Sequence, residues 1–338
     1  MQSLNIIQID KKIYEKNNPL SFHKYIYNMK RFIYSIAQFF FILLIINGCS
    51  SGQDESLSLN STASETPVYN DSQTEDNNDS DIKVIFNSNL DDSLPSEWIT
   101  EYNVILDTLD KRISVYANNY ESLDIYAWNS TADKPFSAQI GNASGACICG
   151  NDQGRYMVLE IPNDEFTYSL MHRYSVIAHE FFHAYQMGIS ANFYSGDFRV
   201  KWISEGSAAV FESLYIQEHY AYNYFKFDQD SVDNEATTSP SIFESYDSSE
   251  TNYSSSVFMV LALVKELIES DITEEVAFKM ILTDFLEQNP NSSNWKNIFE
   301  EVFPFSVETF YQSLASYEAN IAGVLPDENL KLKDIFNN

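Results

Sequence analysis

The chain has 338 residues, of which 44% are hydrophobic and 15% aromatic, so it can bury a substantial core and is not disordered throughout. Its 49 acidic residues outnumber its 20 basic residues, and the net charge is −29. A field of this sign repels phosphate backbones, which excludes nucleic acid as a partner. General solubility is the preferred explanation of this acidity, ahead of a field tuned for basic substrates.

The first 48 residues contain an export signal. Lys30 and Arg31 precede an apolar run over residues 32–46, and Gly48 and Cys49 follow it. This order is typical of a secretory signal, and the run is shorter than the roughly 20 apolar residues of a membrane-spanning helix. Because a signal peptide has no use for the polar residues 1–28, we predict that translation starts at Met29.

Residues 46–49, Ile-Asn-Gly-Cys, resemble the bacterial lipobox, although Asn47 departs from the small or apolar residue usual at its position. The resemblance implies that Cys49 is lipidated and anchors the chain to the membrane of the cell envelope, at the outer membrane or cell surface; simple secretion is the alternative. The rest of segment 49–81 has no basic residue and is rich in polar and acidic residues, which predicts a disordered tether.

Residues 82–338 form the predicted folded domain. Apolar spacing predicts a helix over 94–121, and alternation predicts strands over 123–128 and 155–161. The stretch between the strands contains Cys147 and Cys149 and is expected to be a hairpin or an irregular loop. A disulfide and two free thiols are equally compatible with this spacing, and we expect a disulfide to need a turn.

Helices follow the strands. The first is predicted over 170–187, ended by Gly188, and the second over 204–219, with Ser204 as its N-cap. Strands followed by helices favour an α+β domain. Three further helices are predicted, over 254–269, 273–287 and 306–321.

The first of these helices carries His179-Glu180-Phe181-Phe182-His183, the pattern of zinc hydrolases. A spacing of four puts both imidazoles on one helix face, where they can bind one ion. Glu180 lies about 100° further around the helix axis, where a general base for a bound water is needed.

A catalytic zinc ion usually has three protein ligands, so a third is expected. Glu205 lies at the predicted start of the next helix, and Glu212, seven residues later, shares its face. The small residues 206–209 are expected to let the two site helices approach closely. His219 is a less favoured third ligand, and His172 is expected to be an ordinary, partly exposed histidine.

Residues 202–212 resemble the W-x-x-E-G-x-A-x-x-x-E segment of aminopeptidase N, so that with the histidine pair the region 170–270 resembles the gluzincin metallopeptidases, the clan of thermolysin and aminopeptidase N. The resemblance implies a zincin-like fold, in which a small mixed sheet precedes a largely helical part with both site helices. It also implies one zinc ion, Glu205 as third ligand and Glu212 as the residue that holds a ligand histidine in its tautomer. No acidic residue occurs in 145–150, where the aminopeptidase motif would lie, which favours an endopeptidase or a specialised peptidase.

Tyr253 lies in a segment that resembles the one from which this clan supplies a tyrosine to the oxyanion, and it is the candidate for that role. The expected function is hydrolysis of peptides or proteins in or outside the cell envelope. Two alternatives remain open: a non-catalytic acidic lipoprotein that binds a partner, and a zinc hydrolase with a non-peptide substrate.

Overall fold

The computed structural model describes residues 82–151, 154–246 and 253–336, which all belong to the unit Thr62–Asn338. The proposed signal, Cys49 and the tether lie outside the described residues. A small mixed sheet and a mostly helical remainder confirm the α+β prediction. In the described part of the chain, no helix is both long and apolar enough to cross a membrane.

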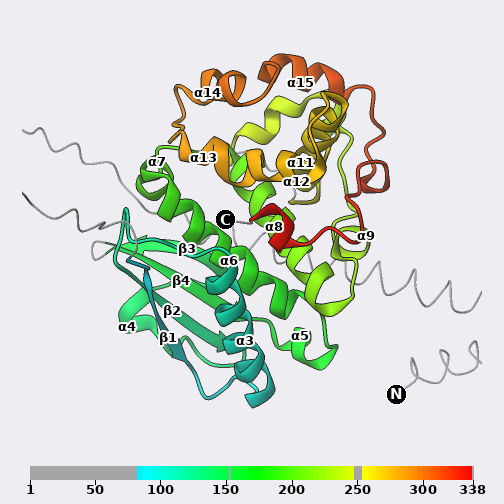
Figure 1. Ribbon diagram of the computed structural model, residues 1–338. Helices are drawn as coiled ribbons and strands as arrows, with labels where there is room; N and C mark the ends of the chain where they lie inside the picture. The colour runs from blue at the N-terminus through cyan, green and yellow to red at the C-terminus, as the bar shows by residue number, and fades with distance from the viewer. Residues whose placement is uncertain (1–81, 152–153, 247–252, 337–338) are drawn as a thin grey trace, which may run out of the picture. The chain divides into compact units, whose positions relative to one another are not determined.

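The sheet has four strands in the order β1-β2-β4-β3 (Figure 1). β1 and β4 run parallel to β2, whereas β3 runs antiparallel to β4. Side chains alternate between the two faces along β2 (Ser122–Asn129) and β4 (Gly154–Ile161). Ile125 and Met157 join the main core with α3 (Ser96–Arg112) and α6 (His172–Ile189). Trp128 and Tyr156 join a smaller cluster with α4 (Ser137–Ile140). The strands are β1 Ile85–Leu90, β2 Ser122–Asn129, β3 Ala146–Asn151 and β4 Gly154–Ile161.

The two cysteines lie within β3 and form a disulfide. Their Cα atoms are 5.5 Å apart, whereas two residues of a regular strand span roughly 6.6 Å. The expectation that only a turn would allow this bond is therefore wrong, because a local shortening of the strand is sufficient. The sulfur atoms belong to the smaller cluster, beside α4 (Ser137–Ile140).

The first long helix, α3 (Ser96–Arg112), is shorter than the predicted 94–121. After it the chain pairs with the segment before β1, through Val84 N to Val115 O at 2.8 Å. It then covers the end of α6, where the Asn119 side chain donates to Met187 O at 2.8 Å. These contacts with distant residues replace helical hydrogen bonds after Arg112.

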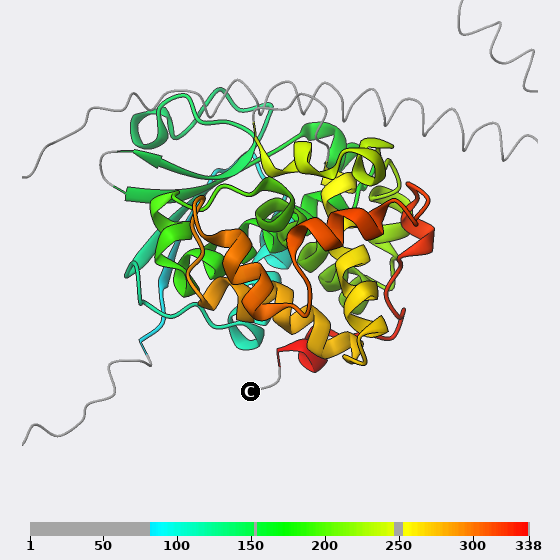
Figure 2. The same cartoon turned by 90° about the horizontal axis from the view of Figure 1, so that it is seen from above.

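The helix with both histidines is α6 (His172–Ile189), and every residue from Ser175 to Gly188 is buried. It lies between the sheet and the helices that follow it in the chain (Figures 1 and 2). Gly188 was predicted to end this helix, but it lies inside it. A Cβ at Gly188 would stand 2.9 Å from Val115 Cγ1, so close packing against the loop requires glycine.

The second site helix, α8 (Lys201–Tyr220), begins three residues before the predicted N-cap. Ser204 is inside the helix, and its hydroxyl donates to Val200 O at 3.0 Å. Gly206 faces α11 (Tyr253–Glu269), since a Cβ there would lie 2.7 Å from Ser256 O. Of the small residues 206–209, which were expected to let the two site helices approach, Gly206 instead serves the contact between α8 and α11.

The last quarter of the chain packs on the side of α6 away from the sheet (Figure 2). The predicted helix 273–287 comprises α12 (Glu274–Lys279), a π-helical turn η3 (Met280–Asp284) and α13 (Phe285–Glu287). The helix predicted over 306–321 is shorter in the structure, where α15 covers Val307–Leu314, and α14 (Trp295–Val302) was not predicted. The other helices are α5 Asn163–Thr167, α7 Ala191–Ser195, α9 Tyr224–Asp228, α10 Glu235–Thr238, η2 Pro240–Glu244, α14 Trp295–Val302, α15 Val307–Leu314, η4 Ile321–Gly323 and α16 Leu332–Ile335.

Candidate metal centre

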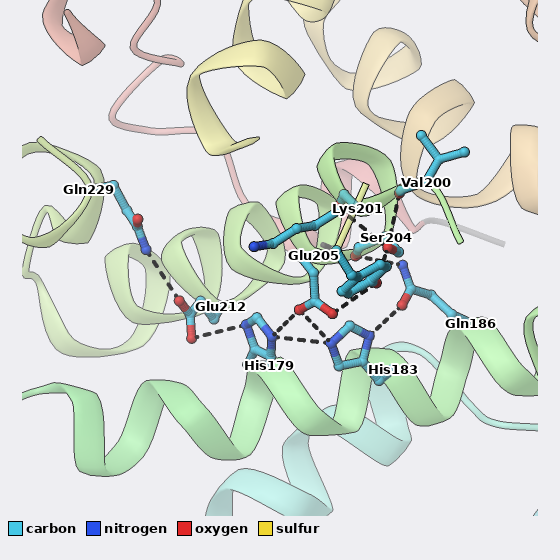
Figure 3. A network of polar contacts seen from close by, with 10 residues as sticks. His179, His183, Gln186, Val200, Lys201, Ser204, Glu205, Glu212 and Gln229 are labelled. Carbon is cyan, nitrogen blue, oxygen red and sulfur yellow. Dashed lines mark hydrogen bonds and ion pairs between the residues drawn. The ribbon is translucent and has the colours of Figure 1, made fainter. Parts of the chain in front are cut away.

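His179 and His183 stand one turn apart on α6, and Glu205 reaches both of them from α8 (Figure 3). The two Nε2 atoms are 3.2 Å apart, and Glu205 Oε2 lies 3.4 Å from His179 Nε2 and 3.3 Å from His183 Nε2. Among the described residues, these three form the group of side chains able to hold a metal ion. The three predicted ligands are thus brought together.

The dimensions of this triangle match one face of a tetrahedral zinc site. Zinc binds histidine nitrogen and carboxylate oxygen at roughly 2.0–2.2 Å, so two tetrahedral ligand atoms are separated by about 3.3 Å. The three observed separations are 3.2, 3.3 and 3.4 Å. His179, His183 and Glu205 would therefore be able to hold one zinc ion without movement of either helix.

The outer nitrogens of both imidazoles face acceptors. His183 Nδ1 lies 2.6 Å from Gln186 Oε1, and the amide of Gln186 donates to Ser204 O at 3.1 Å. His179 Nδ1 lies 3.6 Å from Glu212 Oε2. Protons on Nδ1 leave the two Nε2 lone pairs and a carboxylate oxygen facing one point. Three acceptors this close require a cation between them, either a proton or a metal ion.

Protons and metal ions compete for this centre. Burial acts to lower the pKa of both histidines. Glu205 and Glu212 outweigh burial at His179 and raise its pKa. Glu205 outweighs burial at His183 and raises its pKa as well. Burial likewise disfavours the charged form of Glu205, but the two histidines outweigh it and hold the pKa of Glu205 well below its usual value. The carboxylate is therefore ionised and ready to bind a metal.

The second oxygen of Glu205 is held by a tyrosine. The Tyr246 hydroxyl donates to Glu205 Oε1 at 3.0 Å and lies 2.6 Å from Ser204 Oγ. This contact fixes the carboxylate so that Oε2 faces the histidines. Tyr246 is therefore a positioning residue for Glu205.

Glu180 is 4% exposed, and no described residue donates a hydrogen bond to its Oε2. Burial raises the pKa of this carboxyl, while His179 and His183 act in the opposite direction. A carboxylate with a free oxygen and a raised pKa is suited to accept and return a proton. The role of Glu180 as general base stays a prediction.

Tyr253 begins α11, and the centre of its ring lies 5.8 Å from that of His179. Glu205 and then burial raise the pKa of its hydroxyl well above the usual value, so the group remains a hydrogen-bond donor. Lys201 Nζ lies 5.7 Å from the centre of the Tyr253 ring and 6.0 Å from that of Tyr246. Burial lowers the pKa of Lys201, against the opposing effect of Glu205.

Glu212 was predicted to support a ligand histidine, and the structure places it beside His179. The side-chain amide of Gln229 donates to Glu212 Oε1 at 3.3 Å, and Ser254 Oγ donates to Gln229 Oε1 at 3.3 Å. Gln229 therefore links the residue behind His179 to the start of α11, directly beside Tyr253.

The two other histidines of the domain do not join the centre. His172 Nδ1 pairs with Glu165 at 2.7 Å, and its side chain is 38% exposed, in line with the predicted partial exposure. Burial acts to lower the pKa of His172, but Glu165 outweighs it and raises the pKa to about 9. His219 packs on Tyr215 with ring centres 4.5 Å apart, which leaves Glu205 as the third member of the group.

Three supporting residues, Gln186, Gln229 and Tyr246, were not predicted. The spacing of Gln186, three after His183, could have indicated a hydrogen bond to a histidine on the same helix face. Gln229 and Tyr246 reach the centre from other elements, so only the fold places them there. Tyr246 is also one of 22 tyrosines.

Comparison with known proteins adds no family assignment, because no protein-family model, no curated protein and no solved structure matches the chain. The assignment of function therefore depends on the residues and geometry of the centre itself.

Proposed function

We propose that this protein is a zinc-dependent peptidase of the gluzincin type, with a zincin-like fold, in which His179, His183 and Glu205 hold one ion. The observation that carries the proposal is a triangle of three acceptor atoms of tetrahedral size beside Glu180, a buried carboxylate with a free oxygen. A structural zinc site normally has four protein ligands, and the described residues supply three. This difference favours catalysis over a purely structural ion.

Peptide hydrolysis follows from the groups around the ion. Bound zinc supplies a Lewis acid that polarises a carbonyl and lowers the pKa of bound water toward about 7. Glu180 takes a proton from the attacking water and delivers it to the leaving nitrogen. The protonated Tyr253 hydroxyl donates to the oxygen on which negative charge develops. Glu212, Gln186 and Tyr246 keep the ligand atoms oriented.

The sheet offers one reason to prefer a peptide over another carbonyl substrate. In the described sheet, β3 is an edge strand that pairs with β4 on one side, and it packs against α6. An extended peptide can add to such an edge through backbone hydrogen bonds, which small carbonyl substrates cannot do.

Metal analysis of residues 82–338, combined with a peptide-library digest, tests the proposal. We expect about one zinc per chain and cleavage that stops when EDTA removes the metal. Glu180→Gln should keep the zinc and lower turnover by roughly 10²–10⁴-fold, whereas Glu205→Ala should lose zinc. Zinc-loaded protein that cleaves no peptide would favour a non-peptide substrate or a non-catalytic lipoprotein.

We further propose that the chain is anchored in the bacterial cell envelope through lipid on Cys49. The support is the lipobox-like segment 46–49 followed by a polar, acidic stretch. Labelling with a fatty-acid analogue should mark the wild type and not Cys49→Ser. Equal labelling of both proteins would contradict the anchor, and release of the unlabelled wild type into the medium would indicate simple secretion.

A further inference from the structure

A lysine lies beside the metal centre on the helix that supplies the third ligand. Lys201 opens α8 and precedes Glu205 by four residues, so both side chains lie on one face of the helix. In Figure 3 the Lys201 side chain extends along α8 on the same side as the Glu205 carboxylate. Its ammonium group is therefore held near the reacting centre.

The ammonium group of Lys201 lies near two tyrosine rings. Lys201 Nζ lies 6.0 Å from the centre of the Tyr246 ring and 5.7 Å from that of Tyr253, within the range of cation–π contacts. Tyr246 in turn bonds Glu205, and the Tyr253 ring packs against His179. Lys201 Nζ therefore lies near two side chains that contact Glu205 and His179.

The charge of Lys201 contrasts with that of its surroundings. Glu180, Glu205 and Glu212 are the acidic groups around the two histidines, and the whole chain carries a net charge of −29. Arg199, two residues earlier, is exposed. Its charge acts to lower the pKa of Tyr246, against the larger effects of burial and Glu205, which raise it. The segment that leads into α8 therefore brings cations to an otherwise acidic site.

We propose that Lys201 determines specificity by binding a substrate carboxylate within about two residues of the scissile bond. The inference rests on the proposed peptidase function. One helical turn, about 5.4 Å, separates Lys201 from Glu205, and an extended peptide advances about 3.3 Å per residue. The carboxylate belongs to an aspartate or glutamate side chain or to the C-terminus of the peptide.

Contact with Lys201 can outweigh the repulsion of acidic peptides by the net charge. At physiological ionic strength charges are screened over about 8 Å, so the distant acidic surface contributes little. A hydrogen bond between ammonium and carboxylate is direct and partly shielded from water. We expect an acidic residue at the responsive position to raise kcat/KM about tenfold over its neutral amide.

The test uses matched peptides at 0.15 M salt. A peptide cleaved in an EDTA-sensitive manner is remade with Glu or Gln at each of three positions on either side of the bond, and a short version is made with a free or an amidated C-terminus. The readout is the ratio of kcat/KM between acidic and neutral partners. It is measured for wild type, Lys201→Arg, Lys201→Met, Lys201→Glu and the matched cation variant Arg199→Gln.

The ratio should be near ten for wild type and Lys201→Arg, near one for Lys201→Met and below one for Lys201→Glu. A response confined to the internal Glu peptides identifies a side-chain carboxylate, and one confined to the free acid identifies the C-terminus. An unchanged ratio in Lys201→Met, its loss in Arg199→Gln alone, or loss of zinc from Lys201→Met would overturn the assignment. A wild type that cleaves no peptide instead refutes the proposed function.

Discussion

Gly206 is the neighbour of the proposed ligand Glu205, so replacing it tests how the fold supports the proposed metal centre. In Gly206→Ala the new Cβ would lie 2.7 Å from Ser256 O and 3.0 Å from Val260 Cγ2. Ser256 O belongs to the backbone of α11, so α8 and α11 must move apart by several tenths of an ångström. Overpacking of this kind costs about 1–3 kcal/mol.

A second effect has the opposite sign. Alanine is favoured over glycine inside a helix by about 1 kcal/mol. The net expectation is a loss of about 1 kcal/mol in the free energy of unfolding, or roughly 2–4 °C in Tm for a domain of this size. Because Glu205 moves with α8, zinc affinity should fall as well.

Urea denaturation of zinc-free protein and competition with a zinc chelator measure the two effects. Ser207→Ala is the matched control, because the buried Ser207 hydroxyl has no hydrogen-bond partner among the described residues and its removal should be neutral or stabilising. If Gly206→Ala increases stability by the full helix-propensity gain, close contact with α11 does not constrain this position.

Three further outcomes are expected. Tyr246→Phe should lower zinc affinity about tenfold, because Glu205 Oε1 loses its donor; unchanged affinity in a chelator competition would contradict this role. The raised pKa values of His179 and His183 mean that protons compete with zinc, so zinc affinity should fall as pH is lowered. Calorimetry in buffers of different ionisation enthalpy should detect the protons released when zinc binds. A zinc affinity that does not depend on pH would contradict this competition. His172 has a folded pKa of about 9 against an ordinary 6.5, so its ion pair with Glu165 stabilises the fold fully below pH 6.5 and progressively less as pH rises through 9. His172→Gln should therefore cost more stability at pH 6 than at pH 10 in urea titrations, and an equal cost at both values would exclude this linkage.

The sequence alone determined the chemistry of the candidate centre. The spacing of His179 and His183 specifies one helix face, because the helical period is a local property of the backbone. Glu205 was predicted as the third ligand from the residues around it, 202–212. The strands 123–128 and 155–161 were predicted from the alternation of apolar residues. Each of these predictions depends on residues close together in the chain.

The tertiary structure decided what depends on contacts between distant residues. The local sequence predicted that Gly188 ends a helix and that Gly206 lets the two site helices approach. In the structure, Gly188 allows close packing against Val115, and Gly206 allows close packing against Ser256. Tyr246 and Gln229 reach the centre only because separate segments pack against α8. Local periodicity cannot specify such contacts, since they arise from packing between elements whose relative placement is set by the whole core.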